Sequence, residues 1–385
     1  MSALDQSTSD QGEFDLSSRI KQLRSRMRDH NVDAFLALRS LSVQYLTGFE
    51  HIADAGDPHA VLVTQDTLRF MTDARYFEVA QRQAQQQTGS ELWTVDDLAD
   101  KSLLAQCAET WNLAAFEHIA LEDTVSYRTF SATAALLADT TVLPAKKWVE
   151  DIRRTKDSGE LQRIATAAQI ADLAFPHICD YIRPGISERA VAIELELTLR
   201  RLGADGLAFP CIVASGANAS FPHAVPSERL LAAGDLLTLD FGVSYQGYCS
   251  DMTRTVFVGG GGVRPTDRQQ HIYETVRHAQ EAGLAAIRAG VAGNIVDAAA
   301  RSIIADAGFG QYFIHGLGHG VGMQVHELPG ASLHSKALLP LHAVITCEPG
   351  IYLPGELGVR IEDLVVVEND GHRNLSASPK ELLIV

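Results

Sequence analysis

The sequence predicts two domains, an α/β domain over residues 16–150 and an α+β domain over residues 151–385. Three observations lead to this prediction. The length of 385 residues is enough for two domains that each bury a core. Helical and strand patterns alternate in the first part, whereas the second opens with long helices and continues with several strands around two more helices. A basic and polar stretch that contains proline separates the two parts.

The first domain begins with a predicted helix. In LSSRIKQLRSRMRDH, Ile20, Leu23 and Met27 have helical spacing and follow serines that can cap the helix. The runs VDAFLAL, AVLVT and LRFMT predict buried strands, and another helix is expected from about Tyr76. Further helices are expected in LADKSLLAQCAETW and YRTFSATAALLA. The polar residues 1–15 are expected to form a disordered tail.

The boundary between the domains is placed near residue 150, in LPAKKWVEDIRRTKDSGE. The second domain then opens with two helices, one in GELQRIATAAQIADLAFPHICDYI and one after RPGISE. Two more helices are predicted at 267–289 and about 294–307. Thr266 and Gln269 form the capping-box pattern that starts the former.

The composition is that of a globular protein and excludes several classes of partner. No apolar run approaches the roughly 18–20 residues of a transmembrane helix, and the N-terminus lacks the basic and apolar segments of a secretory signal. Five cysteines without a Cys-x-x-Cys pair fit a reducing compartment, so a cytoplasmic location is expected. The net charge of −16 argues against nucleic acid and anionic membranes as partners.

The stretch HGLGHGVGMQVHE, residues 315–327, combines three histidines and one glutamate with four glycines. It is not a zincin helix, because no histidine follows its His-Glu pair at the required distance. Glycine at every second position disfavours a helix, and the stretch lacks both the Gly-x-Gly-x-x-Gly spacing and the Walker lysine. We therefore expect extended chain that approaches other backbone or a ligand closely, with histidines available to a metal.

Two predicted hairpins carry paired acidic residues. In LLTLDFGVSYQGYCSDMTRTVFV, a turn centred on Tyr245–Gln246 places Asp240 directly opposite Asp251. Such a half-buried pair of like charges calls for a proton or a cation. In VITCEPGIYLPGELGVRIEDLVVV, Glu348 and Glu362 are equidistant from a turn centred on Gly355. Either pair alone is compatible with ordinary acidic residues on a strand surface.

Together with a histidine-rich strand, the two pairs indicate a metal site. Four carboxylates and one imidazole form a mostly hard ligand set, which suits Mn²⁺, Co²⁺ or Fe²⁺ better than a closed zinc site. Four negative charges balance two divalent ions. Two such ions can share a water molecule, lower its pKa and hold it as hydroxide, a chemistry that suits hydrolysis.

The motifs that carry these residues resemble those of a known family. The order PHAVPSERLLAAGDLLTLDFG, GYCSDMTRT, HGLGHGVGMQVHELP, EPGIY and VRIEDLVVV resembles the pita-bread-fold metallopeptidases of the creatinase/methionine aminopeptidase superfamily. Within them the chain is most similar to Xaa-Pro aminopeptidases and Xaa-Pro dipeptidases. QYLTGF and DARYFEVAQRQA resemble the creatinase-like N-terminal domain of that branch. The resemblance runs from about residue 16 to the end and implies a creatinase-like domain followed by a pita-bread catalytic domain.

The resemblance implies a ligand for each metal position. Asp240 would chelate one metal, and Asp251 would bridge both. His319 and Glu348 would bind the other metal, and Glu362 would be the second bridge. Glu348 would also take the proton from the bridging water.

The resemblance also implies residues that face the substrate. His223 and His326 would contact the substrate carbonyl and stabilise the tetrahedral intermediate. His315 would line the pocket on the proline side. Tyr352 and Arg360 would support the metal site or shuttle protons.

The function expected from this resemblance is that of an Xaa-Pro aminopeptidase, which removes an N-terminal residue before proline through a metal-bridging hydroxide. The expected cofactors are two divalent ions, Mn²⁺ first and Co²⁺, Fe²⁺ or Zn²⁺ as alternatives, and a homodimer is expected. An Xaa-Pro dipeptidase is the main alternative, with Arg360, or an arginine from the N-terminal domain or a partner subunit, binding the free carboxylate of proline. A binding module without catalysis is a further alternative. The intact ligands argue against a creatine-type amidinohydrolase, and the N-terminal domain argues against a methionine aminopeptidase.

Overall fold

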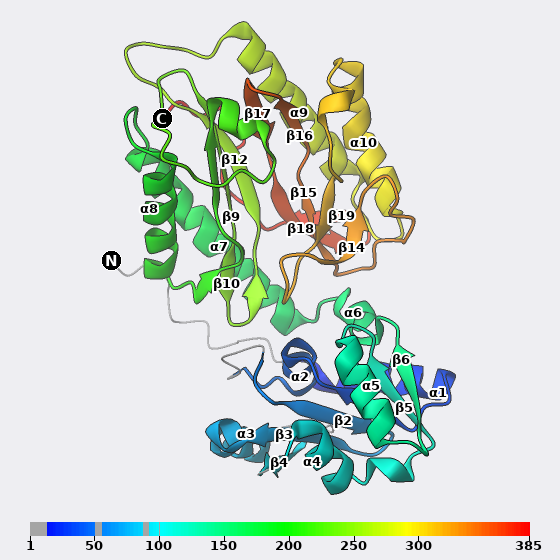
Figure 1. The fold of residues 1–385 in the computed structure, drawn as a ribbon. Helices are drawn as coiled ribbons and strands as arrows, with labels where there is room; N and C mark the ends of the chain where they lie inside the picture. The colour runs from blue at the N-terminus through cyan, green and yellow to red at the C-terminus, as the bar shows by residue number, and fades with distance from the viewer. Residues whose placement is uncertain (1–13, 51–55, 88–91, 100) are drawn as a thin grey trace. The chain divides into compact units, whose positions relative to one another are not determined.

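The computed structural model describes residues 14–50, 56–87, 92–99 and 101–385 (Figure 1). The chain divides into two compact units, of which the first ends at Arg153 and the second begins at Arg154. Most of the expected tail at 1–15 lies outside the described residues. Among the described helices, none is long and apolar enough to cross a membrane.

The N-terminal unit is a six-stranded mixed sheet with helices, in the strand order β4-β3-β2-β1-β5-β6. The three predicted strands form its centre as β1, β2 and β3, because their apolar side chains are buried. Its elements are α1 (Leu16–Asp29), β1 (Ala34–Ala37), α2 (Ser40–Thr47), β2 (Ala60–Thr64), β3 (Leu68–Asp73), α3 (Ala74–Gln86), β4 (Thr94–Leu98), α4 (Leu103–Thr110), η1 (Leu113–Ala115), β5 (His118–Glu122), α5 (Tyr127–Leu136), β6 (Thr141–Ala145) and α6 (Trp148–Arg153).

One local expectation for this unit is wrong. The cap of α1 is Asp15, whose carboxylate accepts a hydrogen bond from the Ser18 N–H at 2.9 Å, and not a serine. The stretch in which the boundary is expected contains the edge strand β6 and the helix α6. Trp148 and Ile152 of α6 are buried, so apolar burial outweighs the turn-like composition of this stretch.

The C-terminal unit contains four small sheets, with strand orders β11-β10-β7, β12-β9-β8, β14-β13-β15-β18-β19 and β16-β17. Its elements are α7 (Ser158–Tyr181), α8 (Glu188–Arg201), β7 (Gly206–Leu207), β8 (Ile212–Ser215), η2 (Gly216–Ser220), β9 (Leu236–Phe241), β10 (Val243–Tyr245), β11 (Tyr248–Cys249), β12 (Met252–Phe257), α9 (Asp267–Ala286), α10 (Gly293–Asp306), η3 (Gly310–Tyr312), β13 (Gly318–Gly320), β14 (Glu327–Ala331), β15 (Val344–Cys347), β16 (Gly350–Leu353), β17 (Leu357–Arg360), β18 (Asp363–Glu368) and β19 (Gly371–Asn374).

Two helix pairs cover the strands of this unit. Helices α7 and α8 share one apolar core with β8, β9 and β12, whereas α9 and α10 share another with β15 to β18. Figure 1 shows the two pairs on opposite sides of the strands, which leaves the inner faces of the strands for a site. The capping box of Thr266 and Gln269 at the start of α9 is confirmed, and α9 ends three residues before the expected 289.

The first acidic hairpin differs from its prediction in register. Asp240 lies opposite Thr253, not opposite Asp251. The expected turn at Tyr245–Gln246 is wrong by one residue, because Gln246–Gly247 forms it with φ values of 47° and 77°. A two-residue turn with both φ values positive favours glycine, which the sequence supplies at 247. Asp251 precedes Thr253 by two residues, so the two aspartates remain diagonal neighbours on one face of the hairpin.

The second acidic hairpin has its predicted register. Gly350 lies opposite Arg360 across β16 and β17, and Cys347 lies opposite Asp363 across β15 and β18. Both ladders are centred on Gly355, whose φ of 74° suits the turn. Glu348 and Glu362 lie between the ladders at opposite positions, as predicted.

Candidate metal centre

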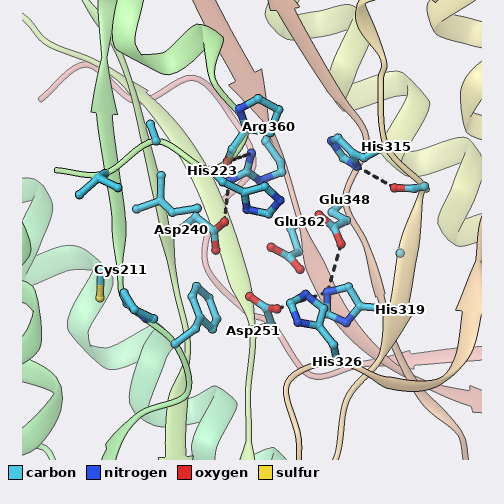
Figure 2. A pocket seen from close by; sticks show the side chains of 18 of the residues that line it. Cys211, His223, Asp240, Asp251, His315, His319, His326, Glu348, Arg360 and Glu362 are labelled. Atoms are coloured by element: carbon cyan, nitrogen blue, oxygen red, sulfur yellow. Dashed lines mark hydrogen bonds and ion pairs between the residues drawn. The ribbon is translucent and has the colours of Figure 1, made fainter.

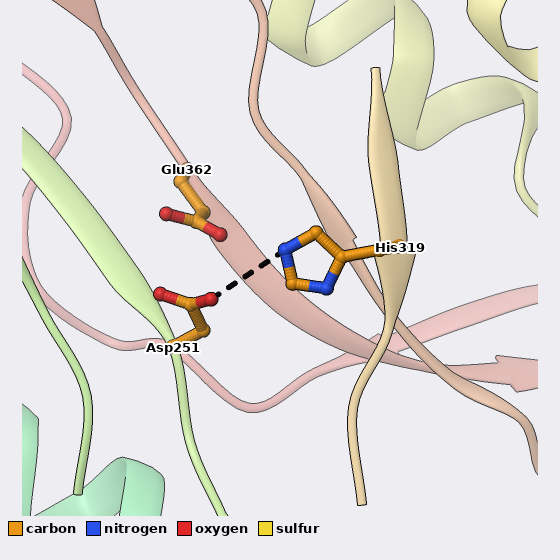
Figure 3. A group of neighbouring side chains, drawn as sticks. All are labelled: Asp251, His319 and Glu362. Atoms are coloured by element: carbon orange, nitrogen blue, oxygen red, sulfur yellow. Dashed lines mark ion pairs between the residues drawn. The ribbon is translucent and has the colours of Figure 1, made fainter. Parts of the chain in front are cut away.

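The five residues assigned to metals converge in the C-terminal unit. Asp240 lies on β9 and Asp251 directly precedes β12, while His319 is the middle residue of β13. Glu348 follows β15 and Glu362 precedes β18. Ligand atoms of Asp251, His319 and Glu362 all lie within 4.8 Å of one another (Figure 3). The Oε1 atom of Glu348 lies 3.3 Å from Nε2 of His319.

Glycines bring the histidine strand into this cluster. A Cβ atom on Gly318 would lie 2.1 Å from the carbonyl oxygen of Thr346, and one on Gly320 would lie 2.5 Å from the backbone of Leu328. Only glycine allows β13 to run this close to both of its neighbours. The expectation of close backbone approach is therefore confirmed, and it fixes His319 between the two glycines.

Three buried carboxylate oxygens in the cluster have no hydrogen-bond partner among the described residues. They are Oδ1 of Asp240, Oδ1 of Asp251 and Oε1 of Glu362. Buried carboxylate oxygens are normally hydrogen-bonded. A buried carboxylate oxygen that has no such partner and lies near other carboxylates is unfavourable without a cation. Open oxygens beside an imidazole nitrogen are the donor set of a divalent metal, so the residues present fit a metal centre.

The electrostatics of the cluster agree with this fit. Burial raises the pKa of Asp240. Burial and the nearby carboxylate of Glu362 raise the pKa of Asp251 well above its usual range. Burial and the charge of Glu348 do the same for Glu362. The protein alone therefore supplies too little positive charge to balance these three carboxylates, and bound cations would lower their pKa values again.

Glu348 and His319 form an ion pair within the cluster. Burial would raise the pKa of Glu348, but the hydrogen bond to His319 outweighs it and holds the pKa at about 2. Burial likewise opposes the charge on His319, and Glu348 raises the pKa of that imidazole above its usual value. Glu348 thus stays ionised, which a role as a metal ligand would require.

A buried hydrogen-bond chain lies beside the cluster. Arg360, 3% exposed, donates through Nη2 to Oδ2 of Asp240 and through Nη1 to Oη of Tyr352 at 2.8 Å. The hydroxyl of Tyr352 is then free to donate to Nε2 of His315, also at 2.8 Å. This leaves Nδ1–H of His315 to donate to the carbonyl of Gly316 at 2.7 Å. Burial lowers the pKa of His315, which agrees with this neutral tautomer.

Nine of the ten predicted residues line one cavity of about 530 Å³, shown in Figure 2. Tyr352 is the exception, because it contacts Arg360 and His315 from behind the wall. His223 and His326 are the exposed imidazoles of the cavity. The His326 ring centroid lies 4.2 Å from that of His319, and burial and this neighbour lower the pKa of His326. The opposite wall is apolar, with Phe209, Pro210, Cys211, Ile212, Pro222, Ala224, Val225 and Pro226.

Two threonines that the sequence analysis missed orient the expected ligands. Thr253 Oγ1 donates to Oε2 of Glu362 at 2.6 Å. Thr346 Oγ1 donates to Oε1 of Glu348 at 3.1 Å and accepts from the His319 N–H at 3.0 Å. Each threonine lies two residues from an expected ligand, Thr253 from Asp251 and Thr346 from Glu348. Strand alternation places residues two apart on one face, and this signal in the sequence could have identified both.

Comparisons with known proteins agree with the two units. Residues 162–369 match metallopeptidase family M24, and residues 19–155 match the creatinase/prolidase N-terminal domain. An Xaa-Pro dipeptidase from Bacillus anthracis is 38% identical with a TM-score of 0.88, over 96% of this chain and all of that chain. An X-Pro aminopeptidase from Thermotoga maritima is 34% identical with a TM-score of 0.83, over 95% and 99% of the two chains.

A relative known from its sequence extends this similarity. The Xaa-Pro dipeptidase of Pyrococcus horikoshii is 32% identical over 96% of this chain and 99% of its own length. Further relatives are also named Xaa-Pro dipeptidase or prolidase. The expected creatinase-like domain and pita-bread catalytic domain are thereby confirmed. The chain belongs to metallopeptidase family M24 and carries the creatinase/prolidase N-terminal domain in front of its peptidase domain.

Proposed function

We propose that this metallopeptidase is an Xaa-Pro dipeptidase, which hydrolyses the bond between an N-terminal residue and a C-terminal proline. The observation that carries the proposal is the end-to-end similarity to a structure named Xaa-Pro dipeptidase, with a TM-score of 0.88. The expected aminopeptidase activity is the second candidate, favoured by the structure of an X-Pro aminopeptidase with a TM-score of 0.83. Both candidates use the same cavity, and they differ in whether the substrate continues beyond the proline.

In the proposal, Asp240, Asp251, His319, Glu348 and Glu362 hold two divalent ions, for which Mn²⁺ is our first candidate. When bound, such ions polarise a peptide carbonyl and lower the pKa of a water molecule. The open oxygens of Asp240, Asp251 and Glu362 support this assignment. Glu348, which is ionised and lines the cavity, accepts a proton from the attacking water. This proton then passes to the proline nitrogen as the peptide bond breaks.

The remaining groups bind and orient the peptide. His326 and His223 are exposed in the cavity and can hydrogen-bond the carbonyl or carboxylate of the substrate. An X–Pro bond has no N–H, so recognition of the ring relies on the walls of the cavity rather than on backbone pairing. His315, held in one tautomer by Tyr352, would line the proline side.

Arg360 is a poor candidate for the partner of the free proline carboxylate. Four of its five N–H groups already donate, to Thr253, Pro222, Tyr352 and Asp240. In a dipeptidase, the proline carboxylate therefore has to be bound by the imidazoles of the cavity or by a cationic side chain that does not line the cavity.

Three peptides test the proposal with metal-loaded protein. Ala-Pro, Ala-Pro-amide and Ala-Pro-Gly share the scissile bond, and only the first carries a carboxylate on the proline. A dipeptidase should cleave Ala-Pro with a kcat/KM about 100-fold above the other two, since a lost hydrogen bond to a charged group costs about 1.5–3 kcal/mol. Equal or faster cleavage of Ala-Pro-Gly would establish the aminopeptidase. Release of alanine from none of the three would refute both candidates.

Location and assembly complete the proposal. The five cysteines form no disulfide, which supports a location in the reducing cytoplasm. A homodimer is also proposed, and sedimentation of the purified protein at micromolar concentration tests it.

A further inference from the structure

We infer that Glu188 is a positioning residue for the reaction, because its buried carboxylate holds the loop that presents His223 to the cavity. We define the His223 loop as residues 215–227. The inference rests on the proposed function, in which His223 contacts the substrate. Glu188 is not one of the proposed metal ligands and does not line the cavity.

Glu188 is the first residue of α8 and is 0% exposed. Its Oε1 atom accepts from the N–H of Ser215 at 2.8 Å and from the hydroxyl of the same residue at 2.7 Å. Its Oε2 atom accepts from the side-chain amide of Asn218 at 2.9 Å, and from the N–H and hydroxyl of Ser227 at 3.1 and 2.6 Å. All five donors belong to the His223 loop. Charge-assisted hydrogen bonds of this kind, shielded from water, are the strong ones.

The five contacts tie together the two ends of the loop. Ser215 and Asn218 lie at its start and Ser227 at its end, so one carboxylate closes a segment of 13 residues. The N–H of Arg189 adds a contact to the carbonyl of Ser227 at 3.0 Å. The start of α8 therefore serves as the base of the loop.

A second anchor holds the middle of the loop from the metal side. Nη1 of Arg360 donates to the carbonyl of Pro222 at 3.3 Å, one residue before His223. The carbonyl of Ala219 lies so close to β17 that a Cβ atom on Gly358 would be 1.8 Å from it. The loop thus lies between Glu188 at its ends and Arg360 at its centre, and Arg360 also binds Asp240.

His223 depends on this loop for its position. Its imidazole is exposed in the cavity and makes no hydrogen bond within the described part of the chain. Figure 2 shows the ring directed toward the space above Glu362 and Asp251. A side chain without hydrogen bonds of its own takes its place from the backbone that carries it, so loosening the loop ends displaces the imidazole.

A glutamine cannot replace Glu188 at this place. Each carboxylate oxygen accepts from one backbone N–H, that of Ser215 or that of Ser227. Whichever way the amide of a glutamine turns, its NH₂ group faces one of these obligatory donors. Glu188→Gln therefore frees one end of the loop while it preserves the size of the side chain.

The test is a double-mutant cycle between Glu188→Gln and His223→Ala, with metal-loaded protein and Ala-Pro as substrate. We expect Glu188→Gln to lower kcat/KM by about 10-fold to 100-fold through displacement of the imidazole. His223→Ala should lower it by about 100-fold or more, and the double variant by no more than about twofold beyond His223→Ala. Metal content should equal that of the wild type, and amide exchange should increase within the His223 loop. The milder Ser227→Ala should lower kcat/KM about 3-fold to 10-fold and couple to His223 in the same way.

Glu122 in the N-terminal unit provides a matched control. It is a buried carboxylate that accepts from the N–H groups of Leu38 and Arg39 and from the hydroxyl of Ser42. Glu122→Gln should lower thermal stability, with an effect on kcat/KM that is multiplicative with that of His223→Ala.

Three results would overturn the inference: losses at Glu188 and His223 that multiply, a loss of metal from Glu188→Gln, or unchanged amide exchange in the loop. A wild-type protein that cleaves no Xaa-Pro peptide would instead refute the proposed function. Amide exchange would then still report whether Glu188 holds the loop.

Discussion

Glu362 and Asp363 are consecutive in the chain and both are buried, yet their surroundings differ in almost every respect. Asp363 accepts from Arg254 at 2.7 Å and from Lys380 at 2.8 Å, and two side-chain amides also donate to it. The carboxylate of Glu362 accepts one hydrogen bond, from Thr253, and its other oxygen has no partner among the described residues. The carboxylate of Asp363 is neutralised by the protein, whereas that of Glu362 keeps one oxygen without a hydrogen-bond partner.

The contrast extends to the regions behind each side chain. Neighbours on an extended chain point to opposite faces, so Glu362 faces the acidic cluster and Asp363 faces a buried polar network. Although burial opposes it, the charges of Arg254 and Lys380 lower the pKa of Asp363, whereas burial and Glu348 raise the pKa of Glu362. A structural carboxylate is paired with cationic side chains of the protein itself. A carboxylate whose neighbours are like-charged indicates a ligand from outside the chain.

The largest expected effect is on activity. Asp251→Asn removes a carboxylate shared, in the proposal, by both ions, and we expect kcat/KM to fall at least about 1,000-fold with a loss of bound metal. Elemental analysis of the variant after metal loading, together with Ala-Pro turnover, measures both quantities. Full metal content in this variant would contradict the assignment of Asp251 to the metal-binding carboxylates.

Asp363→Asn should affect stability instead. It leaves the buried charge of Arg254 and the half-buried charge of Lys380 without their common partner, which costs about 3–5 kcal/mol of unfolding free energy. Denaturant unfolding of the metal-free variant measures this loss. The folded variant should still bind metal with the wild-type stoichiometry, and a stability unchanged within about 1 kcal/mol would show that Asp363 is not structural.

Metal itself should stabilise the wild-type protein. At free Mn²⁺ concentrations of about 100 to 1,000 times the dissociation constant, the free energy of unfolding should rise by about 3–4 kcal/mol and return after chelation. Thermal unfolding with and without a chelator measures the shift. Asp363→Asn should keep the shift and Asp251→Asn should lose it. The same shift in Asp251→Asn would mean that the ions bind elsewhere.

The smallest effect has the most informative sign. In metal-free protein, Asp251→Asn relieves repulsion among buried carboxylates and should raise the free energy of unfolding by about 1 kcal/mol. Denaturant unfolding in the presence of a chelator compares it with the wild type. A destabilisation of several kcal/mol would place Asp251 with Asp363 among the structural carboxylates.

Prediction from the sequence succeeded where local chemistry decides the geometry. In the second hairpin, the turn at Gly355 fixed the opposite positions of Glu348 and Glu362, and the register continues through both ladders. In the first hairpin, the choice of turn centre missed Gln246–Gly247, and the pairing of Asp240 shifted to Thr253. Both aspartates stayed on one face, so the site survived an error that moved the partner by two residues.

Long-range contacts were beyond prediction. In the sequence GISE, Ser187 caps α8 and Glu188 is its first residue, and nothing there indicates that the Glu188 side chain accepts from Ser215 and Ser227. The same holds for Arg254, whose partner Asp363 lies 109 positions away. Such contacts depend on the packing of distant elements, whereas the ligand motifs were recognisable because family resemblance fixes them residue by residue.

Anomalous diffraction from crystals grown with Mn²⁺ tests the central claim most directly. We predict two peaks inside the cavity of the C-terminal unit, with Asp251 and Glu362 in contact with both, Asp240 with one, and His319 and Glu348 with the other. No peak at this cluster, with hydrogen bonds or waters filling the open oxygens of Asp240, Asp251 and Glu362, would contradict it.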